Sequence, residues 1–333
     1  MIPKTMRNLI GTIKDNLSLS KLTLSKPTTS YLHIAVLRTT THSPTTPPTD
    51  HHLTTLLSLG DSSRATASII IHSLTTRLHR TKNTYVALKC LFTVHVIITR
   101  GPFILKDQLA VFPSANGHNN LKLSNFRDKS SAATWILSAW VRWYARYIET
   151  ILFTLKNKSL VSSCFTVSKE KQQDLLSSIM SSDLIRDFGL LVGVIDEICK
   201  VPDELLVERN RLVYGIMELL AHDYLLTVNE LVIRLSEFKV RVKLLSWNEL
   251  VELGSVIDRL TASKERLLQL FPVKKISVET LWEMVEELDN EIGMGKFQKP
   301  GVSQLSLVTE LLEQVVHRVS VWCRLLPLGY LTT

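Results

Sequence analysis

Helical periodicity along the whole sequence predicts an all-α protein whose helices stack into a solenoid. Apolar residues recur at helical spacing throughout the 333 residues, and no run keeps the alternation of a β-strand. Residues 83–99 are apolar on nearly every side and are followed by Gly101-Pro102, a natural stop. Such a helix must be covered from several directions, which stacked helices provide. The composition, 45% hydrophobic and 21% charged, excludes wholesale disorder.

Breaks rich in proline, glycine and small polar residues divide the chain into helical segments. The clearest are SPTTPPT at 43–49 and PSANGHNN at 113–120. Asp61 is expected to cap one helix, and Thr49 or Asp50 the helix before it. The helices expected in order are 29–42, 50–59, 62–80, 83–99, 102–111, 131–157, 170–181, 183–200, 203–222, 223–245, 247–271, 277–292 and 302–326.

Charge is distributed unevenly along the chain. Residues 1–160 hold 20 Lys and Arg against 6 Asp and Glu, whereas residues 161–333 hold 19 against 25. The basic half also carries eight of the ten histidines. Such a half favours a polyanionic partner, either nucleic acid or an acidic membrane surface. The change in charge near residue 160 is the one candidate boundary, and we expect one continuous structure across it.

The N-terminal segment 1–20 is predicted to be an amphipathic helix suited to a lipid interface. Met6, Leu9, Ile10, Ile13 and Leu17 recur at helical spacing and form one stripe, with basic and amide side chains elsewhere on the helix. The alternative is that the stripe packs on the domain or that this end frays.

Basic side chains flank the proline-rich loop between the first two helices of the body. Arg38 and His42 precede the loop, and His51 and His52 open the next helix. Free backbone N–H groups at that helix start make it a favourable place for a phosphate group. A solvated loop with incidental histidines is the alternative. The spacing of the three histidines is not standard for zinc, so no metal site is expected.

Aromatic residues also recur at helical spacing, interleaved with Arg142 and Arg146. One hypothesis is that these side chains stack on single-stranded nucleic acid, but we favour the interpretation that they form a buried helix core. The stripe consists of Trp135, Trp140, Trp143, Tyr144, Tyr147 and Ile151.

No pattern in the sequence indicates catalysis. We find no nucleophile elbow, no zinc-protease motif and no cysteine–histidine constellation, so neither an enzyme nor a cofactor is expected. Cys90, Cys164, Cys199 and Cys323 are far apart and are expected to be buried thiols in a reducing compartment. With neither a secretory signal nor a membrane span in the sequence, we expect a cytosolic protein or one bound peripherally to a cytosolic membrane face.

Several runs resemble the ANTH domain of plant clathrin assembly proteins, within the ENTH/ANTH superfamily. They are AVLRTTTH at 35–42, YVALKCL at 85–91 continuing to Arg100-Gly101, LSNFRD at 123–128 and WVRWYARY at 140–147. Together they cover roughly residues 28–155, and a weaker similarity surrounds Asn229-Glu230. The resemblance implies a right-handed solenoid with a basic ENTH-like part at 26–160 and longer helices at 161–333 belonging to the same domain.

The resemblance also implies a peripheral adaptor of clathrin-mediated endocytosis, found on coated pits, coated vesicles and the Golgi apparatus. Its partners would be phosphatidylinositol 4,5-bisphosphate membranes, clathrin coat or adaptor proteins and a vesicle SNARE, with no nucleic acid. The family's lipid motif aligns with Arg38, Pro48, Asp50 and His51, so two of its lysines are replaced. Lipid binding would rest on Arg38, His42, His51 and His52, and Met217 and Val242 would lie near the SNARE groove. The alternative is a protein-interaction scaffold that has lost phosphoinositide binding.

Overall fold

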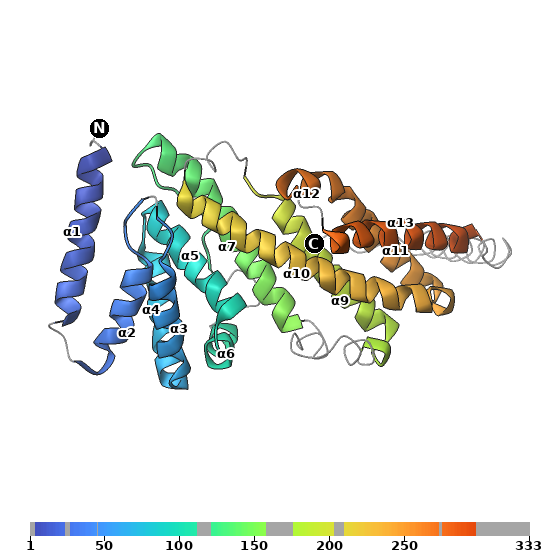
Figure 1. Cartoon of the computed structure of the whole chain (residues 1–333), viewed down its shortest axis with the longest axis horizontal. Coiled ribbons are helices and arrows are strands. Elements are labelled where there is room, and N and C mark those ends of the chain that lie inside the picture. The colour runs from blue at the N-terminus through green and yellow to red at the C-terminus, as the bar shows by residue number, and fades with distance from the viewer. Residues whose placement is uncertain are drawn as a thin grey trace, which may run out of the picture.

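The computed structural model describes residues 4–23, 27–44, 46–111, 121–157, 176–202, 210–272 and 275–297. Within these residues every regular element is helical, which confirms the all-α prediction. Figure 1 shows the helices stacked along the long axis of the molecule, from α1 at the N-terminal end to α11 and α13 at the other. The elements are α1 (Lys4–Thr23), α2 (Pro27–Thr39), α3 (Asp50–Asp61), α4 (Arg64–Arg80), α5 (Thr84–Arg100), α6 (Phe103–Val111), α7 (Ala132–Asn157), α9 (Ser181–Cys199), α10 (Arg211–Arg241), the 3-10 turn η3 (Val242–Leu244), α11 (Trp247–Ala262), α12 (Lys264–Leu270) and α13 (Ile276–Phe297).

Capping side chains set the starts of α3 and α4. Thr49 accepts a hydrogen bond from the backbone N–H of His52, which confirms it as the cap of α3. The predicted cap of α4 is wrong, because Asp61 is still inside α3. Ser63 caps α4 instead, through a reciprocal capping box with Thr66.

Two expected helix boundaries in the C-terminal half are also wrong. The sequence predicts two helices at 203–222 and 223–245, but α10 is a single helix from Arg211 to Arg241. It has no proline or glycine near residue 222 to end it, and packing against α9 and α13 supports its length. Conversely, the expected helix 247–271 divides at Ser263 into α11 and α12. The expected helix 302–326 lies outside the described residues.

The core runs through the stack and is centred on α5 and α7. Almost every side chain of α5 from Thr84 to Ile98 is buried, as its all-round apolar sequence predicts. Trp140, Trp143 and Tyr147 of α7 are at most 3% exposed. The aromatic stripe is therefore helix core over most of its length, whereas Trp135 at its start is half exposed.

A buried polar network joins α5, α7 and α10. Asp223 Oδ2 lies 2.6 Å from His95 Nε2 and accepts a hydrogen bond of 2.7 Å from the Tyr147 hydroxyl. His95 Nδ1 lies 2.8 Å from the Tyr144 hydroxyl. Burial, followed by the charge of Asp223, raises the pKa of both tyrosines well above the ordinary value. Each of the four side chains thus has a partner in a region that excludes most water.

The described cysteines are free thiols. Cys90 is fully buried, and burial raises its pKa to about 12, while Cys199 is partly buried. Cys164 and Cys323 lie outside the described residues. Among the described helices none is both long and apolar enough to cross a membrane.

Candidate anion-binding site

The N-terminal helix α1 docks on the body with its apolar stripe facing solvent. Leu9, Ile13 and Leu17 are 61%, 54% and 56% exposed, and Ile10 is also exposed. The opposite face carries Gly11, which is buried against His42. Met6 belongs to α1, but its side chain lies outside the described residues. The stripe does not pack on the domain over its described part, so the helix keeps a free apolar face beside the body.

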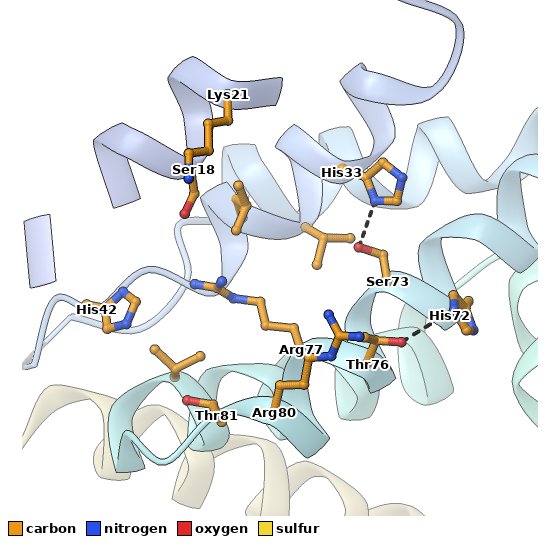
Figure 2. Close-up of a pocket in the computed structure, with 13 residues that line it drawn as sticks. Ser18, Lys21, His33, His42, His72, Ser73, Thr76, Arg77, Arg80 and Thr81 are labelled. Atoms are coloured by element: carbon orange, nitrogen blue, oxygen red, sulfur yellow. Dashed lines mark hydrogen bonds between the residues drawn. The ribbon is translucent and has the colours of Figure 1, made fainter. Parts of the chain in front are cut away.

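An open basic groove of about 720 Å³ lies where α1, α2 and α4 meet. Figure 2 shows its polar side chains arranged around this common space. Lys21 comes from α1, His33 from α2, His42 from the loop after α2, and Arg77 and Arg80 from α4. The complete lining is Ser18, Lys21, His33, Val36, Leu37, His42, His72, Ser73, Thr76, Arg77, Arg80, Thr81 and Val86.

Helix α4 presents the largest polar share of this lining. His72, Thr76 and Arg80 are spaced four residues apart, and Ser73 and Arg77 run beside them, so all five share one face of the helix. The opposite stripe of α4 is buried in the core. Ser73 is in turn held by a contact of 3.0 Å between its hydroxyl and His33 Nδ1 (Figure 2).

Asp15 of α1 lies beside the groove and contacts His42 and Arg77, which line it. Its Oδ2 accepts the backbone N–H of His42 at 2.8 Å, and its Oδ1 lies 2.7 Å from His42 Nδ1 and 3.5 Å from Arg77. Burial opposes ionisation of this carboxyl, but the hydrogen bonds of His42 and the charges of His42 and Arg77 outweigh it, so the pKa of Asp15 is lowered. The carboxylate therefore partly neutralises the groove.

Lys89 of α5 lies beneath the same cluster. Its side chain is 1% exposed, and its ammonium donates to the Thr41 hydroxyl at 2.9 Å. Burial and, to a lesser extent, Arg77 lower the pKa of Lys89 from 10.5 to about 8, and Asp15 opposes this change. The lysine is thus still mostly protonated at pH 7 and adds positive charge under the groove.

Replacing Lys89 with methionine is expected to stabilise the protein at pH 7 by about 2 kcal/mol. Because its folded pKa is lowered by more than two units, the buried charge costs about 3 kcal/mol, of which the hydrogen bond to Thr41 returns about 1 kcal/mol. Between pH 8 and 10.5 the unfolded state binds the extra proton, so the native protein gains stability as pH rises and the advantage of Lys89→Met shrinks.

Urea unfolding at pH 7, 8 and 9.5 checks this expectation. The exposed Lys82→Met serves as the matched control and should stay within about 0.5 kcal/mol of the native protein. A Lys89→Met variant that is less stable than the native protein at pH 7 would contradict the cost assigned to the buried charge.

Of the four side chains predicted to bind phosphate, only His42 lines the groove. Arg38 is exposed at the end of α2, and His51 and His52 open α3. Burial, then His51 and Arg38, lowers the pKa of His52, so these three form a second basic cluster. Asp50 is a carboxylate within this second cluster and lies 3.4 Å from Arg100.

A metal site is not formed by these histidines. Across the described ranges, no group of three His, Cys, Asp or Glu side chains has an arrangement that could hold a metal ion.

The two residues predicted for a partner groove lie far apart along α10 and the turn that follows it. Met217 is partly buried in α10, and Val242 is 6% exposed at the start of η3. They stand roughly 37 Å apart at the rise of a helix. Neither lines the apolar cavity of about 360 Å³ between α5, α7, α9 and α10.

Sequence reasoning missed most of the groove, namely Lys21, His33, His72, Arg77 and Arg80. The signal available was the polar face of α4, where basic and hydroxyl side chains recur at helical spacing opposite an apolar stripe. Such a face is usually solvated. Only the packing of α1 and α2 beside it turns it into a groove.

Comparisons with known proteins agree with this architecture. The profile of the ANTH domain matches residues 31–251. A protein of Arabidopsis thaliana named as a clathrin assembly protein is 43% identical over 294 residues, covering 86% of this chain and 80% of the relative. A second clathrin assembly protein from the same plant is 30% identical over 301 residues, and the alignment covers 87% of each chain. A third clathrin assembly protein of that plant is 37% identical over 150 residues, which cover 44% of this chain and 25% of the relative. Because the ANTH profile matches residues 31–251 and a relative that is 43% identical covers 86% of this chain, this protein belongs to the ANTH domain family.

Proposed function

We propose that this protein is a peripheral membrane adaptor of clathrin-mediated endocytosis that binds phosphatidylinositol 4,5-bisphosphate in the groove between α1, α2 and α4. Membership of the ANTH family and the names of its relatives support a role in clathrin coat assembly. The single observation that supports lipid binding is that the basic groove is lined by Lys21, His42, Arg77 and Arg80.

The chemistry of the groove suits a polyphosphorylated headgroup. Guanidinium groups form strong, charge-assisted hydrogen bonds with phosphate oxygens, and lysine supplies a further charge. The hydroxyl of Thr76 adds a neutral polar group at the same surface. A volume of about 720 Å³ is ample for an inositol ring with several phosphates.

Basic side chains of the groove compensate for the two lysines of the family's lipid motif that this sequence lacks. Pro48 is buried, and Asp50 carries the wrong charge, so neither position can replace a lysine. Arg77 and Arg80 supply equivalent charge from α4 instead. The exposed stripe of α1 adds a second, apolar attachment, and stable peripheral binding takes two such signals.

The protein partners follow from the family. Clathrin coat or adaptor proteins are the proposed partners of the assembled domain, and a vesicle SNARE helix is a further one. Met217 and Val242 stay predictions for that contact, as do the Golgi location and the division into segments 1–20, 26–160 and 161–333. Under this proposal the protein carries out no catalysis and acts at coated pits and vesicles.

Co-sedimentation with vesicles tests the lipid proposal. The protein is expected to bind vesicles containing phosphatidylinositol 4,5-bisphosphate more tightly than phosphatidylserine vesicles of the same net charge. Raising the salt concentration should weaken both interactions but preserve the preference, because screening acts on charge and not on headgroup geometry. Equal binding to the two vesicles would contradict the proposal and favour a scaffold that acts through protein contacts alone.

A further inference from the structure

Asp15 places a carboxylate against His42 and Arg77, two basic side chains that line the groove. Both of its oxygens contact His42, at 2.7 and 2.8 Å, and Oδ1 also lies 3.5 Å from Arg77. Electrostatically it also faces Lys89, whose pKa it raises against the effect of burial. A phosphate oxygen would seek the same donors, because carboxylate and phosphate are recognised by the same basic groups.

Arg77 is not saturated by this carboxylate. One of its terminal nitrogens donates to the Thr40 carbonyl at 2.8 Å, and Asp15 stands at a longer ion-pair distance. Its buried Nε has no hydrogen-bond partner within the described part of the chain. A guanidinium offers five N–H donors, so Arg77 can accommodate a ligand with more oxygens than a carboxylate provides.

Asp15 also holds α1 in place. Gly11 and Asp15 lie one turn apart on α1, and both meet His42. A Cβ at position 11 would stand 2.8 Å from the Cβ of His42, so glycine permits this close approach. The apolar stripe of Leu9, Ile13 and Leu17 lies on the opposite face of the helix. Loss of the Asp15 contact would therefore loosen the helix that carries the exposed stripe.

We propose that Asp15 is an internal competitor for the phosphate site and a latch for α1, an inference that rests on the proposed lipid function. In the free protein its carboxylate occupies His42 and Arg77 and docks α1. A phosphate group of the ligand takes over these donors and displaces Asp15. The N-terminal part of helix α1 then loses its contact with the loop at His42 and can turn its apolar stripe into the bilayer, while Lys21 stays at the groove.

The Asp15→Asn variant tests the competition, with Asp61→Asn at the exposed end of α3 as the control of equal charge change. Vesicles containing phosphatidylinositol 4,5-bisphosphate should bind Asp15→Asn about fivefold more tightly than the native protein, the effect of one elementary charge beside an anionic surface. Asp61→Asn should stay within about twofold. Affinity of Asp15→Asn equal to or below that of the native protein would overturn the competition.

Hydrogen exchange of the backbone amides of residues 9–20 tests the latch without any lipid. These amides should exchange at least about fivefold faster in Asp15→Asn than in the native protein, and faster in the native protein when inositol hexakisphosphate is added. Unchanged exchange in both cases would overturn the latch. If neither protein prefers phosphoinositide over phosphatidylserine, the proposed function itself fails, and the competition fails with it. Selective binding by the native protein without a gain in Asp15→Asn overturns the competition alone.

Discussion

Replacing both Lys21 and Arg80 with alanine is expected to weaken binding to phosphatidylinositol 4,5-bisphosphate vesicles by about 30-fold. Both side chains line the groove, and both are exposed, so their loss removes charge without opening the core. Each cation near an anionic membrane is worth about 1 kcal/mol, and two such losses amount to about 2 kcal/mol. Co-sedimentation over a range of lipid concentrations measures the change.

A double variant in the C-terminal part of the stack provides the matched control. Lys243→Ala with Lys275→Ala removes the same net charge from exposed positions in η3 and just before α13. Its affinity should stay within about threefold of the native protein, because these residues lie far from the groove along the stack (Figure 1). An equal loss in both double variants would contradict a localised site and indicate attraction by net charge alone.

The Arg38→Ala variant separates the groove from the cluster formed by Arg38, His51 and His52. If the groove holds the headgroup, this exposed arginine contributes only to general attraction, and its loss costs about fivefold or less. A loss larger than that of the Lys21 and Arg80 double variant would place the headgroup at the junction of α2 and α3 instead.

Replacing Asp223 with alanine is expected to lower the free energy of unfolding by about 3 kcal/mol. The carboxylate is the shared partner of His95 and Tyr147, and its removal leaves both polar groups buried without that partner. Breaking a buried ionic or hydrogen-bonded network from one side costs about 3–5 kcal/mol, and the lower figure applies because Asp223 borders a cavity that water can enter. Urea unfolding at pH 7 measures the loss.

Two further variants make this result specific. Asp223→Asn keeps an acceptor oxygen and should lose less stability than Asp223→Ala. Asp258→Ala, an exposed substitution in α11, should stay within about 0.5 kcal/mol of the native protein. Vesicle binding by folded Asp223→Ala should be unchanged, because the network lies in the core away from the groove. A loss below about 1 kcal/mol would show that the network does little to hold α5, α7 and α10 together.

Local patterns in the chain were enough to predict most helices and the amphipathic character of α1. The all-round apolar sequence of α5 predicted its burial, and Thr49 was one of the two residues predicted to cap α3. The stripe of Leu9, Ile13 and Leu17 predicted an amphipathic helix, although its exposure could not be known beforehand. Boundaries failed where the local signal was weak, as at Ser63 and within α10, because tertiary packing decides how far a helix of moderate propensity extends.

The amino-acid sequence by itself determined the all-helical architecture, the basic N-terminal half and the resemblance to the ANTH family, because these depend on periodicity, composition and short runs. It did not determine which basic residues converge. Lys21, His33 and Arg80 are separated in the chain and look like solvated positions until α1, α2 and α4 pack side by side. The pairing of Asp15 with His42 likewise joins residues 27 positions apart. Long-range contacts of this kind arise from how whole helices bury their apolar faces, and only the tertiary structure records that outcome.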